Sequence, residues 1–279
     1  MKIFFIVLGS LVGFLALCFC LFLILIKPSS KKRDVMARYK GVKFAHRGLH
    51  DTEKAENSMS AFAAAVECGY GIELDVRLSK DGELVVFHDD TVDRMTEARG
   101  RVDSFTAKEL AKMHLGGTED GVPTLCEVLK LVDGRIPLLV EIKEDLGKYG
   151  VTHKAAEILA EYKGEFIIES FNPLSIARMK SLMPDVARGL LCSNYLKNPK
   201  TRNIKTFVVQ NMLLNIRCKP DFIAYAHKDW KDAGLAMIRT FYPKTPLVCW
   251  TLKSPEDEAA AKEHGFTSFI FENYKSELE

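Results

Sequence analysis

The sequence predicts an α/β fold: a closed (β/α)8 barrel with a small insertion after its second strand, preceded by one transmembrane helix. Three observations lead to this prediction: eight short apolar runs, amphipathic segments between them, and an uncharged apolar stretch near the start of the 279 residues. Such alternation is typical of parallel strands joined by helices, and the length suits eight β/α repeats. A doubly wound open sheet shows the same alternation and stays an alternative.

The first element is the apolar stretch, residues 3–26, which contains no charged residue. About 20 apolar residues span a bilayer as a helix, so we expect a membrane anchor within residues 1–27. A cleaved signal peptide is the alternative, but the apolar run is too long for one and no small-x-small cleavage site precedes Lys27. Residues 28–40 then form a basic linker to the barrel domain, residues 41–279.

Basic residues are concentrated after the apolar stretch. Lys2 and the amino terminus precede it, whereas six basic residues follow it, namely Lys27, Lys31, Lys32, Arg33, Arg38 and Lys40. The positive-inside tendency therefore predicts a single-pass protein of the cell membrane with its barrel on the cytoplasmic side, and export by an uncleaved signal anchor is the alternative. The net charge of +2 is too small to indicate a nucleic-acid partner.

Cysteine usage agrees with a reducing compartment. Five cysteines outside the apolar stretch lack metal or disulfide spacing, and we expect them to be small buried residues: Cys68, Cys126, Cys192, Cys218 and Cys249.

The remaining elements follow in order along the chain. Strands are predicted at residues 42–46, 71–76, 138–143, 166–169, 187–191, 222–225, 247–251 and 268–271. Helices are predicted at residues 58–67 behind Asn57 as the cap, 152–162, 174–183 and 256–263. Residues 84–88, a strand after a hairpin turn at Lys80-Asp-Gly82, begin an insertion that continues as a long loop through Gly100 to Gly117.

Two of these strands carry ionisable residues at alternate positions, Glu73 with Asp75 and Glu141 with Lys143. Residues two apart on a strand share a face, so we expect all four side chains to converge inside the barrel. Three carboxylates packed together raise each other's pKa unless a cation neutralises them. Hard oxygen ligands suit one divalent ion, Mg²⁺ or Ca²⁺.

Histidines end two strands. His46 and Arg47 end the first, where barrel enzymes hold their reacting groups, and His88 follows the strand of the insertion with Asp89 beside it to orient it. Paired histidines suit phosphodiester cleavage, in which one group accepts a proton and another donates one. The alternatives are a capped strand end with a surface arginine and a surface histidine.

The ordered motifs of the chain resemble the glycerophosphodiester phosphodiesterase family over most of residues 40–279. They are His46-Arg-Gly48, Glu56-Asn57-Ser58, Glu73-Leu-Asp75, Lys80-Asp-Gly82, Val85-Val86-Phe87-His88-Asp89, Arg94-Met-Thr96, Pro123-Thr-Leu125 and Glu141-Ile-Lys143. The resemblance implies hydrolysis of glycerophosphodiesters to glycerol 3-phosphate and an alcohol. It also implies a metal on Glu73, Asp75 and Glu141, acid–base catalysis by His46 and His88, and phosphate contacts from Arg47 and Lys143.

Later motifs agree in part with the same family. Val248-Cys-Trp250-Thr251 resembles it, and we expect Trp250 to line the substrate pocket, with a core aromatic as the alternative. The chain departs from the family pattern at Ala55, where proline is common, and at Glu272-Asn273, where the last strand commonly ends Thr-Asp. These departures affect the local contacts of the closing strand.

Three other functions remain alternatives. A lysophospholipase-D-like enzyme acting on membrane lysolipids would exploit the anchor and need an apolar groove beside the site. A non-catalytic membrane-tethered binding protein would not need both histidines and all three acids. A barrel aldolase or isomerase with a Schiff base on Lys143 would leave those residues unexplained. The sequence carries no signal for the oligomeric state.

Overall fold

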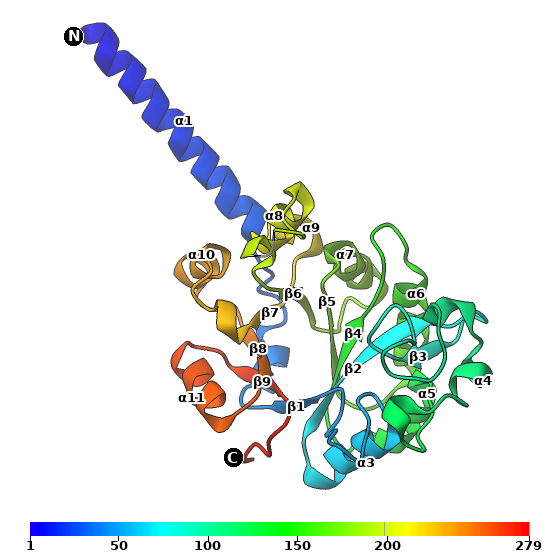
Figure 1. Ribbon diagram of the computed structural model, residues 1–279. Helices are drawn as coiled ribbons and strands as arrows, with labels where there is room; N and C mark the ends of the chain where they lie inside the picture. Colours follow the sequence, from blue (N-terminus) through cyan, green and yellow to red (C-terminus); the bar gives the residue numbers. More distant parts are fainter. Residues whose placement is uncertain (198, 279) are drawn as a thin grey trace.

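The computed structural model describes residues 1–197 and 199–278 and confirms the closed parallel barrel (Figure 1). Its eight strands pair side by side and β9 returns to β1, which excludes the open sheet. In barrel order they are β1 Lys43–His46, β2 Gly71–Leu78, β4 Leu138–Ile142, β5 Phe166–Ser170, β6 Arg188–Cys192, β7 Phe222–Ala226, β8 Leu247–Leu252 and β9 Ser268–Phe271. All eight coincide with the predicted strands to within about two residues.

Helices surround this barrel and follow its strands. They are α3 Met59–Cys68, α5 Leu125–Val132, α6 Gly150–Glu161, α7 Pro173–Leu182, α8 Ile204–Gln210, α9 Asn215–Cys218, α10 Ala233–Phe241 and α11 Pro255–Glu263. Short 3-10 turns occur at η3 Tyr195–Lys197 and η4 His227–Asp229. Side chains alternate along the strands, so Ile72 and Leu74 pack outward in the main core, while Leu139 and Ile167 belong to a second cluster with residues of other strands.

The segment before the barrel contains a short helix, α2 Arg33–Ala37, and is packed against the barrel. Met36 and Tyr39 are buried in the second cluster, together with Phe44 and Phe222. Residues 28–40 therefore contribute to the barrel core besides carrying basic side chains.

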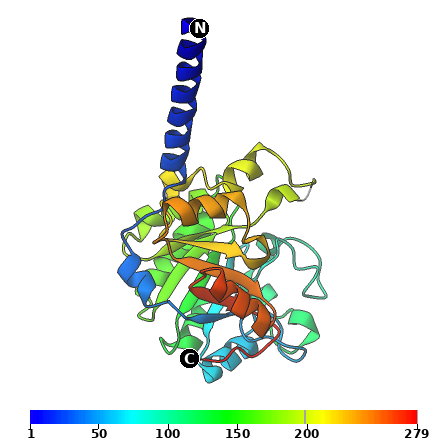
Figure 2. The same ribbon diagram turned by 90° about the vertical axis from the view of Figure 1, so that its left-hand side faces the viewer.

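The apolar stretch forms one continuous helix, α1 Lys2–Ile26, which projects from the barrel in both views (Figures 1 and 2). Its residues are almost all apolar, and of these 25 residues Ile26 alone is buried. By length and composition, α1 is able to cross a membrane.

The insertion begins as predicted and then departs from the prediction. Strand β3 Leu84–Val86 pairs antiparallel with β2 after a turn at Gly82, where φ is +80°. The expected long loop instead contains η1 Val102–Ser104, α4 Ala107–Leu110 and η2 Leu115–Gly117. These elements have a small core of their own, which includes Phe87 and Leu110. Helix α4 is fixed by a reciprocal cap between Thr106 and Glu109.

Two local predictions were wrong. The cap of α3 is Ser58, whose hydroxyl accepts from the backbone N–H of Ala61, and not Asn57. Three cysteines are buried, but Cys68 at the end of α3 and Cys126 in α5 are exposed. These two cysteines lie on helices that cover the barrel, where one face of each helix meets solvent.

Candidate active site

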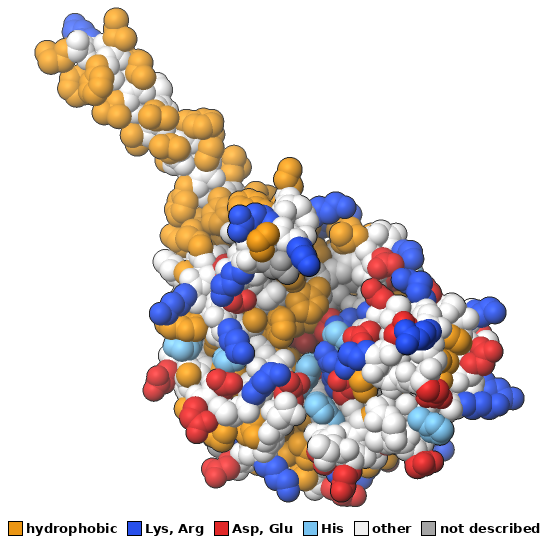
Figure 3. Space-filling view, in the orientation of Figure 1, with side chains coloured by type: hydrophobic (Ala, Val, Ile, Leu, Met, Phe, Trp, Pro, Cys, Tyr) orange, Lys and Arg blue, Asp and Glu red, His pale blue; other side chains and the backbone are white. Residues whose placement is uncertain are grey.

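The predicted site residues lie toward the carboxyl ends of the barrel strands. His46 ends β1, Glu73 and Asp75 lie in β2, and Glu141 lies in β4. The register places His46 opposite Glu73 and Asp75 opposite Glu141, which brings their side chains to one side of the sheet. In the space-filling view, a hollow combines histidine and charged side chains with an adjoining apolar area (Figure 3).

The three carboxylates converge as predicted, and Lys143 joins them. Ligand oxygens of Glu73, Asp75 and Glu141 lie within 4.8 Å of one another, and all three residues are buried. The Lys143 ammonium lies 3.1 Å from Asp75 Oδ1 and 2.7 Å from Glu141 Oε1. Burial and the neighbouring acids raise the pKa of Glu73 well above its usual range, and burial raises that of Glu141 to about 7.

The charge of Asp75 is held in place by cations. Burial alone would raise its pKa, but Lys143 and then Arg47 lower it well below its ordinary value. Asn57 also donates to Asp75 Oδ2 over 2.9 Å. This contact explains why Asn57 does not cap α3, because its side chain points into the barrel and its φ is +56°. The predicted cation site therefore holds a balanced set of buried charges.

Arg47 connects the carboxylates to the rim of the site. Its backbone N–H donates to Glu73 Oε2, and its guanidinium contacts both Glu56 and Asp75. Arg47 itself has a φ of +55°, a conformation that non-glycine residues seldom adopt. The next residue, Gly48, has a φ of +84°, and a side chain there would meet Ala61 at 2.9 Å. The turn after β1 is thus shaped to aim Arg47 inward.

His46 is oriented by Glu272, a residue that follows β9. Its Nδ1 lies 2.5 Å from Glu272 Oε2, and its Nε2 lies 4.0 Å from Glu73 Oε2. Glu272 also contacts Lys253 at 2.6 Å and lies 3.9 Å from His50. Burial would raise the pKa of Glu272, but these neighbours, His46 first, lower it well below its ordinary value. Because Glu272 engages Nδ1, the Nε2 atom of His46 faces the carboxylates.

His88 has the orienting acid that the sequence predicted. Asp89 Oδ1 lies 2.6 Å from His88 Nδ1, and Arg94 in turn donates to Asp89 Oδ2 over 2.6 Å. Arg94 also contacts Glu56, the same acid that binds Arg47. Burial lowers the pKa of both His88 and His46, which favours neutral imidazoles able to accept a proton. A chain of ion pairs therefore links Arg47, next to His46, with Asp89, next to His88.

Glu169 is a site residue that the sequence prediction missed. It lies in β5 opposite Glu141, it is 1% exposed, and its Oε2 has no hydrogen-bond partner among the described residues. Burial, and then the nearby acids Glu141 and Glu73, raise its pKa well above the usual range. The signal was present in the sequence, since an acid in a buried apolar strand is uncommon.

Aromatic residues form an apolar wall beside Lys143. The Phe171 ring lies 5.5 Å from Trp250 and 6.3 Å from Tyr195, measured between ring centroids. Lys143 Nζ lies 5.6 Å from the Phe171 centroid, which joins the wall to the charged cluster. Trp250 is partly buried and packs against the second core cluster, and its role in a substrate pocket stays a prediction.

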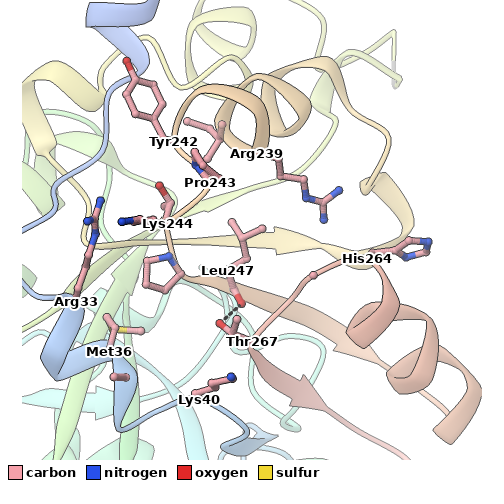
Figure 4. A pocket seen from close by; sticks show the side chains of 15 residues that line it. Arg33, Met36, Lys40, Arg239, Tyr242, Pro243, Lys244, Leu247, His264 and Thr267 are labelled. Atoms are coloured by element: carbon pink, nitrogen blue, oxygen red, sulfur yellow. Dashed lines mark hydrogen bonds between the residues drawn. The ribbon is translucent and has the colours of Figure 1, made fainter.

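Another pocket, of about 390 Å³, lies at the opposite end of the barrel, around the starts of β8 and β9 (Figure 4). Its cationic side chains do not converge: Arg239 points toward His264, whereas Arg33 and Lys244 lie across the pocket (Figure 4). The carboxylates and His46 and His88 are absent from its lining, so the chemistry belongs to the other end.

The donor set fits a hard divalent cation. Burial first, and the neighbouring acids after it, raise the pKa values of Glu73 and Glu141, so a cation among these closely spaced oxygens would stabilise the ionised carboxylates. Oxygen donors of this kind suit Mg²⁺ or Ca²⁺. A second group, His46 with His50 and Glu272, is differently arranged, because Glu272 already binds His46 and the Lys253 ammonium.

Comparisons with known proteins point in one direction. The model of the "Glycerophosphoryl diester phosphodiesterase family" matches residues 46–275. A glycerophosphodiester phosphodiesterase of Caldanaerobacter subterraneus subsp. tengcongensis is 41% identical over 167 residues, which cover 56% of this chain and 68% of the relative. Human glycerophosphodiester phosphodiesterase 1 is 30% identical over 278 residues, covering 84% of this chain and 78% of that protein.

The solved structures agree on the fold. A phosphodiesterase of Oleispira antarctica, in complex with the product sn-glycerol-3-phosphate, superposes with a TM-score of 0.70 at 20% identity. The match covers 85% of this chain and 95% of that one.

Proposed function

Because the chain belongs to the glycerophosphoryl diester phosphodiesterase family and is therefore a phosphoric diester hydrolase, we propose that it hydrolyses glycerophosphodiesters to glycerol 3-phosphate and an alcohol such as choline or ethanolamine. The observation that carries this proposal is the joint geometry of the site. Two oriented histidines, a partly buried arginine and a partly buried lysine surround three buried carboxylates at the mouth of one barrel.

Glu73, Asp75 and Glu141 would hold one divalent cation, Mg²⁺ or Ca²⁺. When bound, such an ion supplies Lewis-acid stabilisation of the charge on the phosphoryl oxygens. Asn57 keeps Asp75 in position from one side, and Lys143 neutralises Asp75 and Glu141 from the other.

Arg47 and Lys143 would bind the phosphate. The planar fork of Arg47 suits two phosphate oxygens, and its neighbours Glu56 and Asp75 fix its direction. Lys143 keeps its positive charge because the adjacent carboxylates raise its pKa against the opposing effect of burial. A charged ammonium can pair with a phosphate but cannot act as a Schiff-base nucleophile, which argues against the aldolase alternative.

His46 and His88 would form the acid–base pair. Each histidine has a carboxylate at Nδ1, Glu272 or Asp89, which leaves Nε2 free to exchange a proton with the substrate. One Nε2 accepts the proton of the attacking oxygen, from water or from the neighbouring glycerol hydroxyl. The other histidine acts as an imidazolium, and its Nε2 donates a proton to the departing alcohol oxygen as the bond of that oxygen to phosphorus breaks.

Helix α1 would anchor the enzyme in the cell membrane, with the barrel on the cytoplasmic side. The basic residues that follow α1 support this orientation. Protease added to intact cells is expected to leave the barrel whole, whereas cleavage of the barrel would reverse the assignment.

A second candidate is lysophospholipase-D-like hydrolysis of membrane lysolipids. The observation in its favour is the apolar wall of Phe171, Tyr195 and Trp250, which offers a surface for an acyl chain next to the phosphate-binding groups. Both candidates use the same catalytic groups and differ only in the substrate.

The test presents the full chain with glycerophosphocholine, glycerophosphoethanolamine, glycerophosphoinositol and lysophosphatidylcholine. We expect release of glycerol 3-phosphate from at least one of the first three; release of lysophosphatidic acid from the last would support the second candidate. Failure to cleave any of the four would reject both proposals. His46→Ala and His88→Ala are each expected to lower kcat by roughly 10²–10⁴. His153→Ala, on the surface of α6, provides a matched control that should retain the activity.

A further inference from the structure

Helix α1 is docked on the barrel and is more than a flexible tether. The Tyr242 hydroxyl donates to the carbonyl of Leu23, and Asn215 Nδ2 donates to the carbonyl of Ile26 over 2.8 Å. Ile26 is 1% exposed within the main core. These contacts involve α9 and the end of α10, so the direction of α1 fixes which face of the barrel approaches a bilayer.

A contact between aromatic rings of α1 and α10 determines how deep this face of the barrel lies relative to the bilayer. A span of about 20 apolar residues beginning near Ile3 reaches beyond Phe19, so Phe19 lies within the hydrocarbon region. The Phe241 ring at the end of α10 lies 5.5 Å from the Phe19 ring and is 41% exposed. Phe241 must therefore lie at the boundary of the hydrocarbon whenever α1 spans the membrane.

Exposed apolar side chains gather on the neighbouring helices. On α8, Ile204 and Phe207 are 84% and 49% exposed and lie three residues apart, on one side of the helix. Ile216 on α9 is also exposed. Helix α9 packs against the end of α1, and α8 lies close by in the preceding part of the chain (Figure 1). Exposed large apolar residues that cluster in this way mark an interaction surface.

The same segment is strongly basic. Residues 193–220 contain six lysines and arginines and no aspartate or glutamate: Lys197, Lys200, Arg202, Lys205, Arg217 and Lys219. Lys27 at the end of α1 lies beside this segment, because Lys219 Nζ donates to the Lys27 carbonyl over 3.5 Å. Basic residues close to an anionic bilayer are attracted to its surface.

We propose that Ile204, Phe207, Ile216 and Phe241 form a membrane face that enters the headgroup layer of an anionic bilayer beside α1. This inference rests on the proposed anchor. The occupant is a lipid surface, because the patch is continuous with the membrane-spanning helix and surrounded by positive charge. Apolar side chains inserted beneath basic ones are the usual composition of an interfacial helix.

The membrane face is linked to the catalytic site through the chain itself. Tyr195, in η3 just before α8, contacts Phe171 of the apolar wall. Docking of α8 therefore holds one side of the site's mouth near the lipid headgroups.

The test uses the full chain in lipid nanodiscs loaded at one chain per disc, so that a second copy cannot cover the patch. The discs contain phosphatidylcholine with phosphatidylserine and a lipid that carries a nitroxide quencher close to its headgroup. Phe207→Trp introduces a fluorophore on the membrane face. Leu278→Trp is the matched control, because Leu278 is 52% exposed in the C-terminal segment, which ends far from α1 in both views (Figures 1 and 2).

After subtraction of the unsubstituted chain, we expect quenching at position 207 to exceed that at position 278 by at least about twofold, since only the first contacts lipid. We also expect the excess to shrink when phosphatidylserine is omitted. Equal quenching at the two positions would overturn the membrane face, and so would a chain that separates from the discs.

Turnover of glycerophosphocholine, measured in the same discs, separates this inference from the proposed function. Quenching without turnover supports the membrane face and rejects the substrate class. Turnover with equal quenching at the two positions rejects the membrane face alone.

Discussion

Replacing Lys143 by methionine removes a cation that contacts both Asp75 and Glu141. The Lys143 side chain is 11% exposed and those of its partners are 1% and 8% exposed, so the three charges are screened little by water. Methionine keeps most of the side-chain volume and loses the charge. Removal of one partner from a buried ion pair costs about 3–5 kcal/mol, because the remaining charge is left uncompensated.

The expected loss is large enough to measure by thermal unfolding. For a domain of this size, 1 kcal/mol corresponds to about 2–4 °C in Tm, so Lys143→Met should lower Tm by roughly 6–20 °C in the presence of EDTA. The fluorescence of Trp230 and Trp250 can follow the transition. Saturating Mg²⁺ or Ca²⁺ should restore part of the loss, because a divalent cation on the carboxylates replaces the missing charge.

A matched control comes from Lys148, which pairs with Asp145 over the same distance, 3.1 Å, but is 67% exposed. Exposed pairs contribute roughly 0–1 kcal/mol, so Lys148→Met should shift Tm by no more than about 4 °C. If the two substitutions lowered Tm equally in EDTA, Lys143 would not be neutralising buried carboxylates, and the charge balance inferred for the site would be wrong.

Three further predictions concern the supports of the site. Glu272→Gln should lower kcat by roughly 10–10³, with a smaller change in KM, because the histidine at the end of β1 loses its orienting acid; unchanged kcat would contradict that role. Gly48→Ala should destabilise the barrel by more than Gly82→Ala, as measured by urea unfolding, since both glycines have positive φ but only the first faces a clash. Glu258 binds Ser276 and is paired with the buried Lys43 at 3.0 Å. Burial would raise its pKa, but these partners, Ser276 first, lower it, so the stability that ionised Glu258 contributes is present above an unfolded pKa of about 4.3 and is lost as pH falls through the folded value. Glu258→Gln should therefore destabilise strongly at pH 7 and progressively less in urea titrations toward acid, and a constant difference would count against the pairing.

The sequence was sufficient for the barrel and for much of the candidate site because both follow from short-range geometry. Residues two apart on a strand share a face, which predicted that Glu73, Asp75, Glu141 and Lys143 would meet. Asp89 follows His88 directly in the sequence, so their contact could also be predicted. The roles of these residues in catalysis and metal binding stay predictions.

Contacts made by barrel closure could not be predicted in the same way. Glu272 reaches His46 across 226 positions of sequence, and only the pairing of β9 with β1 brings them together. Asn57 and Ser58 are both good cap residues, so their order could not be decided without the backbone conformation. Glu169 is a different case, because the alternation of side chains along its strand is enough to predict that it points into the barrel.

Turnover by the metal-stripped chain tests the central claim most directly. The full chain is treated with EDTA, exchanged into metal-free buffer, and assayed for release of glycerol 3-phosphate while Mg²⁺ or Ca²⁺ is added back. We expect no turnover without a divalent ion, a saturable return with one of them, and no return for Glu141→Gln, which removes one of the three carboxylates. Full activity of the stripped chain, or unchanged metal response in Glu141→Gln, would contradict a metal held by Glu73, Asp75 and Glu141.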